Sequence, residues 1–300
     1  MYYHVTSTSF SRLRLVVVCA ALLVGAVKEG YGQRVYGNRD LINSVYSPGI
    51  AGILLGVSGV ENRSNAIDGD LDNSSQLRLV ALGGLEAWQS IRFPSGNLPA
   101  PNSPIYVKLT PPPAVLSLLS GISIVRTVGD DATTVGEAYS DGQLLDLLGL
   151  LSENQPVEFT IPVPEDSQDL VEFDGVRFWI GGVLSAGSIG RYYFAFFISK
   201  PLLLSPSKEI CEKEQASIQL SHFEPGYKYR VYSNETGGSP IAETTSSLQI
   251  SLPTFATEGV FTYWVEAVDS DTYVSARVPF KVTVLPQPGK PHLTITDIHN

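Results

Sequence analysis

The chain has 300 residues, of which 17% are charged, 43% are hydrophobic and 10% are aromatic. Its 27 glycines and 20 prolines argue against a helical bundle, and its few charges argue against a solvated, disordered chain. The formal charge of −10 disfavours nucleic acid as a partner, because an acidic surface repels phosphates. Four histidines and two cysteines supply neither a zinc-type cluster nor a disulfide framework.

Residues 1–32 have the pattern of a secretory signal peptide. Arg12 and Arg14 precede an apolar run of thirteen residues, and small residues lead to a cleavage position after Gly32. The run is shorter than the ~20 residues that a membrane helix needs. No later segment is apolar enough to cross a membrane, so we expect a secreted or cell-surface chain with a charge of −12 after cleavage.

The rest of the chain is predicted to be all-β, because β-branched and aromatic residues are abundant. Over residues 34–200, short apolar segments alternate with turns, which predicts a jelly-roll β-sandwich. The candidate helix in this region is Gln143–Leu151. Residues 203–286 contain about seven short strands, which predicts an immunoglobulin-like sandwich. Residues 287–300 form a tail or the start of a truncated module.

Side-chain alternation predicts the core face of two strands in the second domain. In YKYRVY, Tyr229 and Val231 share one face and Arg230 lies on the other. In VFTYWVEAV, Tyr263 and Val265 share the core face, which exposes Trp264.

This second domain resembles the Ig-like modules of exported proteins from Bacteroidetes-type bacteria. The resemblance rests on EICEKEQASIQL, the Gly-Gly turn in SNETGGSP, and the aromatic strand before Ser275 and Arg277. Those modules have a cysteine near the first core strand and a second one shortly before the Ser-x-Arg segment. Here Tyr273 stands at the second position, which leaves Cys211 without a family partner.

The first domain resembles the galactose-binding-like jelly roll of discoidin-type and carbohydrate-binding modules, through VENRSNAIDGDLDNSSQLRL at Val60–Leu79. In that fold this turn often closes a calcium-holding loop. Asp68, Asp70 and Asp72 alternate through it, and Ca²⁺ prefers clustered carboxylate and carbonyl oxygens. A structural calcium site is therefore one expectation. An Asx-rich turn, in which these side chains bond the local backbone, is the other.

Trp88 is the candidate ligand-binding residue, since it follows a Gly-Gly turn and its ring could stack on a sugar. Packing in the core or at its rim is the alternative. The paired carboxylates could also form a glycosidase acid and base, although turn-like surroundings favour solvated loop charges. These pairs are Asp130 with Asp131, Glu165 with Asp166, and Glu172 with Asp174.

The sequence contains no nucleophile elbow, P-loop or zinc-protease motif. We therefore expect a non-enzymatic, exported protein for surface adhesion or ligand display, with an extracellular glycan or surface protein as partner. One alternative is a purely structural spacer of a surface assembly. A polysaccharide-processing enzyme with an Ig-like accessory domain is a third reading.

Overall fold

The computed structural model describes residues 33–45, 58–79, 86–112, 121–140, 155–163, 170–181 and 189–287. Apart from one short 3-10 helix, η1 (Arg63–Ala66), the regular elements in these ranges are strands, so the all-β prediction is confirmed. The predicted signal peptide, the candidate helix at Gln143–Leu151 and residues 288–300 lie outside the described residues. Within them, no helix is long and apolar enough to cross a membrane.

The first of two sheets in the N-terminal sandwich has the strand order β3-β4-β11-β6-β9, and β1 also pairs with β11. All of its pairs are antiparallel. The central strand carries the continuous apolar run YYFAFFI because both of its faces are covered. The bounds are β1 (Arg34–Tyr36), β3 (Gly59–Glu61), β4 (Ser75–Arg78), β6 (Ile105–Thr110), β9 (Val157–Ile161) and β11 (Ile189–Ile198).

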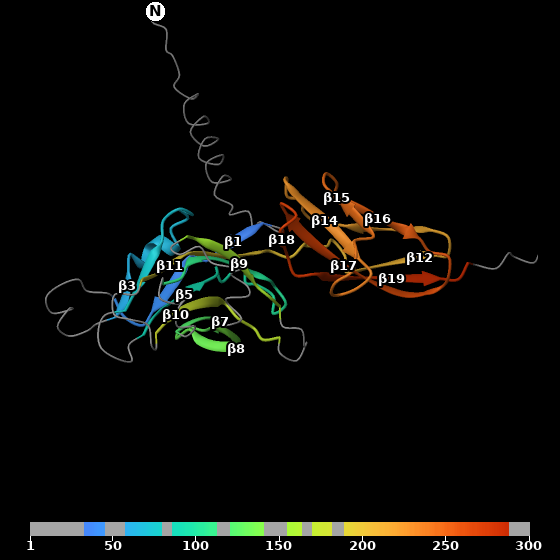
Figure 1. The fold of residues 1–300 in the computed structure, drawn as a ribbon. Helices are drawn as coiled ribbons and strands as arrows, with labels where there is room; N and C mark the ends of the chain where they lie inside the picture. Colours follow the sequence, from blue (N-terminus) through green and yellow to red (C-terminus); the bar gives the residue numbers. More distant parts are fainter. Residues whose placement is uncertain are drawn as a thin grey trace, which may run out of the picture. The chain divides into compact units, whose positions relative to one another are not determined.

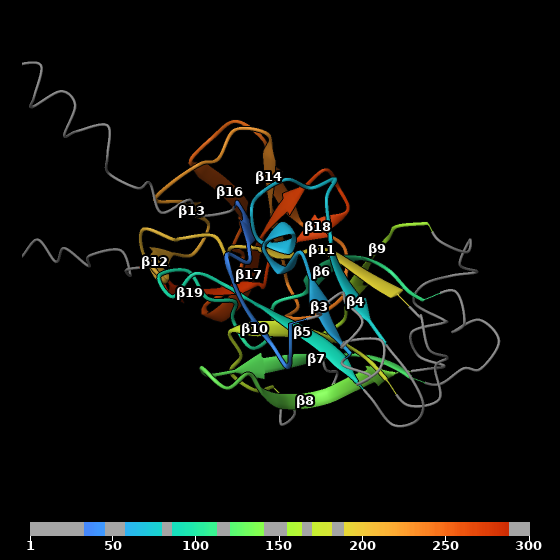
Figure 2. The same ribbon diagram turned by 90° about the vertical axis from the view of Figure 1, so that its left-hand side faces the viewer.

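The second sheet of this sandwich has the order β2-β5-β10-β7-β8, again antiparallel throughout. Both views show β8 beside β7 at the edge of this sheet (Figures 1 and 2). Alternate residues of its strands, such as Ile91 and Phe178, are fully buried against the first sheet in one apolar core. The bounds are β2 (Arg39–Ile42), β5 (Ala87–Arg92), β7 (Ile122–Val128), β8 (Thr133–Ser140) and β10 (Gly175–Ile180).

The C-terminal sandwich pairs one sheet of order β12-β19-β17-β14-β15, with β18 on β17, against the two strands β13 and β16. Strand β12 runs parallel to β19, and the other pairs are antiparallel. The bounds are β12 (Ser207–Cys211), β13 (Gln215–Gln219), β14 (Tyr227–Tyr232), β15 (Ala242–Thr244), β16 (Gln249–Thr254), β17 (Gly259–Asp269), β18 (Tyr273–Val274) and β19 (Val278–Leu285).

The predicted alternation of this domain is confirmed for the core residues, whereas Trp264, which was predicted to be exposed, is half-buried. Tyr229 and Val231 are 1% and 0% exposed in the apolar core, whereas Arg230 points to the outer face and forms ion pairs. Val265 is fully buried, and Tyr263 packs against the same core.

The apolar core of the C-terminal domain extends to aromatic residues on the outer face of the first sheet. Tyr106 of β6 and Phe196 of β11 belong to the same buried cluster as the Ig-like core. Tyr273 of β18 contacts both rings, with centroid distances of 4.8 Å to Tyr106 and 5.2 Å to Phe196. The two sandwiches are therefore joined by buried aromatic packing as well as by the chain.

Candidate functional site

The outer face of the second sheet carries two neighbouring tryptophans. Ladder pairing places Trp88 of β5 directly opposite Trp179 of β10. Their strand neighbours Ala87 and Ile180 are fully buried in the core, so alternation directs both indoles away from it. Both tryptophans are half-buried. Trp88 is thus a surface residue on a sheet face.

Two charged residues fix the indole rings. The guanidinium carbon of Arg177, also on β10, lies 4.0 Å from the centroid of a Trp88 ring, a close cation–π contact. The indole N–H of Trp179 donates a hydrogen bond of 2.7 Å to Glu86 Oε2. Arg177 Nη2 also donates to the carbonyl of Ala132, in the turn between β7 and β8. We call Trp88, Trp179, Arg177 and Glu86 the tryptophan platform.

A neighbouring glycine makes room for the platform. A Cβ atom on Gly181 would lie 2.5 Å from a ring carbon of Trp179, so the indole covers a position that tolerates no side chain. The alternation in VRFWIGG could have identified Arg177 and Trp179 as residues of one face. Their place beside Trp88 depends on strand order and register, which the sequence does not reveal.

The electrostatics of the platform centre on Arg177. Burial lowers the pKa of this guanidinium, and the negative charges of Glu86 and Asp131 act in the opposite direction. Neither carboxylate forms an ion pair with it among the residues that the structure describes. Arg177 is therefore a partly desolvated cation stacked on an aromatic ring.

The aspartate loop forms successive hydrogen-bonded turns. Asp68 Oδ1 accepts from the backbone N–H of Asp70 at 2.9 Å, and Asp70 Oδ1 accepts from that of Asp72 at 3.0 Å. Asp68 Oδ2 accepts from the side-chain amide of Asn73 at 3.0 Å. The bonds from Asn73 and from the backbone lower the pKa of Asp68.

These contacts fit an Asx-rich turn better than a cation site. The ammonium of Lys108 donates to the carbonyl of Leu71 at 3.0 Å, so a fixed positive charge already occupies one loop oxygen. Within the described ranges, no three acidic, histidine or cysteine side chains gather closely enough to hold a metal ion. Calcium binding by Asp68, Asp70 and Asp72 stays a prediction.

Two of the carboxylates from the predicted pairs meet at one arginine. Asp130 and Asp174 each bind Arg92, at 2.6 Å from separate guanidinium nitrogens. Asp131 accepts hydrogen bonds from the backbone N–H and the hydroxyl of Thr133, the first residue of β8. Glu165 and Asp166 lie outside the described residues, and the absence of enzymatic activity stays a prediction.

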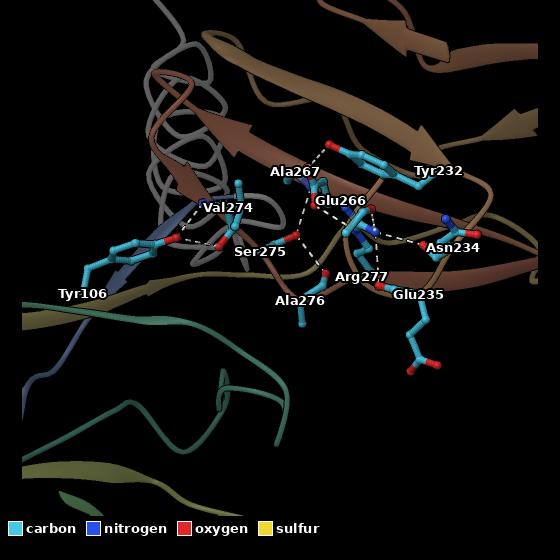
Figure 3. A network of polar contacts seen from close by, with 11 residues as sticks. Tyr106, Tyr232, Asn234, Glu235, Glu266, Ala267, Val274, Ser275, Ala276 and Arg277 are labelled. Carbon is cyan, nitrogen blue, oxygen red and sulfur yellow. Dashed lines mark hydrogen bonds and ion pairs between the residues drawn. The ribbon is translucent and has the colours of Figure 1, made fainter. Parts of the chain in front are cut away.

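The Ig-like domain has a buried ionic network on the outer face of β17 (Figure 3). Glu266, 5% exposed, accepts hydrogen bonds from Tyr232 and from Arg277 Nε, the latter at 3.1 Å. Arg277 Nη1 donates to the carbonyls of Asn234, Glu235 and Gly237. The arginine after the Ser-x motif thus fixes the Gly-Gly turn, and this network is structural.

Cys211 is a free thiol, and it lies far from Tyr273. Cys211 is opposite Leu285 on β19, next to the start of β17, whereas Tyr273 pairs with Asp269 at the end of β17. Ten residues of strand separate those ends, which is about 33 Å. A disulfide needs Cα atoms within ~7 Å. The expectation that Cys211 is unpaired agrees with its free thiol, and in this fold a cysteine at position 273 would be too far away to pair with it.

Residues 199–286 match the family model described as "Ig-like domain CHU_C associated". The Ig-like assignment of the C-terminal domain is therefore confirmed, and such modules are typical of exported bacterial surface proteins. No curated protein matches the chain. No comparison shows a galactose-binding-like domain in residues 34–200, so that assignment stays a prediction.

Two solved structures are similar over longer stretches. The fibronectin(III)-like modules of Clostridium thermocellum CbhA share 15% identity, covering 70% of this chain and 93% of that chain, with a TM-score of 0.22. The BSP domain of a biofilm associated protein shares 11% identity, covering 91% and 55%, with a TM-score of 0.23. At these TM-scores neither similarity supports a fold or a function for this chain.

Proposed function

We propose that the chain is an exported, non-enzymatic bacterial surface protein that binds an extracellular glycan through the tryptophan platform. The observation that carries the proposal is the side-by-side placement of Trp88 and Trp179 on the outer face of a sheet. The signal-peptide pattern of residues 1–32 and the Ig-like domain support export to the cell surface.

The chemistry of the platform suits a sugar chain. Indole rings stack on the apolar faces of pyranose rings, and few polar groups beside them are enough to orient hydroxyls. Glu86 and Arg177 supply such groups at both ends of the tryptophan pair. The resemblance of residues 34–200 to carbohydrate-binding modules points to the same ligand class.

A rigid spacer in a surface assembly is the second candidate. It is favoured by the buried aromatic contacts among Tyr106, Phe196 and Tyr273, which couple the two sandwiches. A spacer needs this coupling and does not need the platform.

Screening the purified chain against glycans and matrix proteins distinguishes the two candidates. We expect glycan binding that falls at least about tenfold in Trp88→Ala and in Trp179→Ala, the loss of one stacking contact. Trp264→Ala, in the Ig-like domain, is the matched control and should bind normally. A correctly folded chain that binds neither glycans nor matrix proteins would leave the spacer as its function.

A further inference from the structure

Arg177 differs from Arg92, which lies on the same sheet face, in having no carboxylate partner. Arg92, on the same sheet face, binds Asp130 and Asp174 at 2.6 Å each. No ion pair in the described part of the chain includes Arg177. Its direct contacts are with the Trp88 ring and one backbone carbonyl, while Glu86 and Asp131 act on its charge without forming an ion pair.

The geometry of the guanidinium leaves part of its donor edge free. Nη2 donates to the Ala132 carbonyl, and Nε is buried and out of reach of a ligand, so the Nη1 end of the guanidinium is the edge that a ligand could meet. Stacking on Trp88 fixes the plane of the group, and Arg177 is half-buried, so its remaining N–H groups have a defined direction. Burial with incomplete pairing costs free energy, which an anionic ligand would offset.

We propose that the ligand of the tryptophan platform is a glycan that carries carboxylates, with Arg177 binding the carboxylate of a uronic acid beside the indoles. The inference rests on the proposed glycan-binding function and adds the class of sugar. A planar guanidinium matches a carboxylate through two parallel N–H···O bonds, and a neutral sugar hydroxyl cannot make this pair. Glu86, the acidic group of the platform, accepts a hydrogen bond from the Trp179 indole and forms no ion pair with Arg177.

The test compares uronate polymers with their own neutral derivatives. Alginate, polygalacturonate and hyaluronan are each measured beside the carboxyl-reduced polymer, by affinity electrophoresis of the full chain in the presence of a chelator. The chelator prevents calcium bridges between acidic polymers and the aspartate loop. We expect at least one uronate polymer to bind about tenfold or more tightly than its reduced form.

Variants assign this preference to Arg177. Arg177→Gln should remove the difference between each polymer and its reduced form. Arg191→Gln, which removes the same charge from an exposed position on β11, should preserve it. Arg177→Lys keeps the charge without the planar fork and should weaken uronate binding several-fold, which provides a second variant where Arg177→Gln does not fold.

The outcomes distinguish the role of Arg177 from the proposed glycan-binding function. If neutral glycans bind as tightly as uronates, or if Arg177→Lys binds uronates like wild type, the role of Arg177 is overturned while glycan binding stands. If no glycan of either kind binds the folded chain, the proposed function and the inference both fail.

Discussion

Glu266 and Arg277 form an ion pair that is largely removed from water. Their side chains are 7% and 13% exposed, and Tyr232 covers the pair, with its ring centroid 3.5 Å from the Arg277 guanidinium carbon. Every carbonyl that Arg277 binds belongs to the turn after β14. Because a buried charge without a partner costs several kcal/mol of folding free energy, removing either residue of this pair destabilises the domain.

Removing Arg277 should therefore destabilise the Ig-like domain strongly. We expect Arg277→Ala to lower the free energy of unfolding by about 3–5 kcal/mol, the typical cost of leaving a buried charge unpaired. Urea denaturation followed by tryptophan fluorescence would measure it. Lys228→Ala, which removes a cation from the exposed pair with Asp271, is the control and should have a small fraction of this effect. A cost of under about 1 kcal/mol for Arg277→Ala would contradict the role given to this pair.

At the scale of single elements, the sequence predicted strands where alternation was regular. The pattern of YKYRVY assigned Tyr229 to the core and Arg230 to the outer face, because a strand has a period of two. The pairing of strands could not be predicted from the sequence. Strands β5 and β10 are more than eighty residues apart, and only their register places Trp179 beside Trp88. The same limit applies to Tyr273, whose distance from Cys211 follows from strand order.

The aspartate loop could be stabilised either by its own hydrogen bonds or by a bound calcium ion. Its side chains already bond one another and the backbone, and Lys108 binds the Leu71 carbonyl, so we expect a turn that is stable without metal. A chelator should then leave the melting temperature of the chain unchanged. If calcium instead holds the loop, the chelator will lower the melting temperature of wild type and have no effect on the Asp68→Ala/Asp70→Ala variant.

At the scale of the whole molecule, aromatic residues and one arginine connect the two sandwiches. Arg34 of β1 binds Asp269 of β17 at 2.6 Å and lies 4.6 Å from the Tyr273 ring centroid. The hydroxyl of Tyr106 accepts from the Val274 N–H at 2.7 Å and donates to its carbonyl at 3.2 Å (Figure 3). Because these groups are packed in one apolar cluster, unfolding of either sandwich exposes surface of the other.

We expect the intact chain to unfold in one cooperative thermal transition. Variants that weaken the contact between the two sandwiches should unfold in two transitions. Tyr106→Phe leaves the Val274 N–H without its acceptor, a loss of about 1–3 kcal/mol, and Tyr273→Ala removes the ring between Tyr106 and Phe196. Differential scanning calorimetry would measure the effect as a fall in the ratio of van't Hoff to calorimetric enthalpy. Tyr139→Phe is the matched control, since its hydroxyl bonds Pro162 within the first sandwich and its loss should preserve one transition. Two resolved transitions in wild type would show that the packed junction does not couple the domains, and would weigh against a rigid spacer.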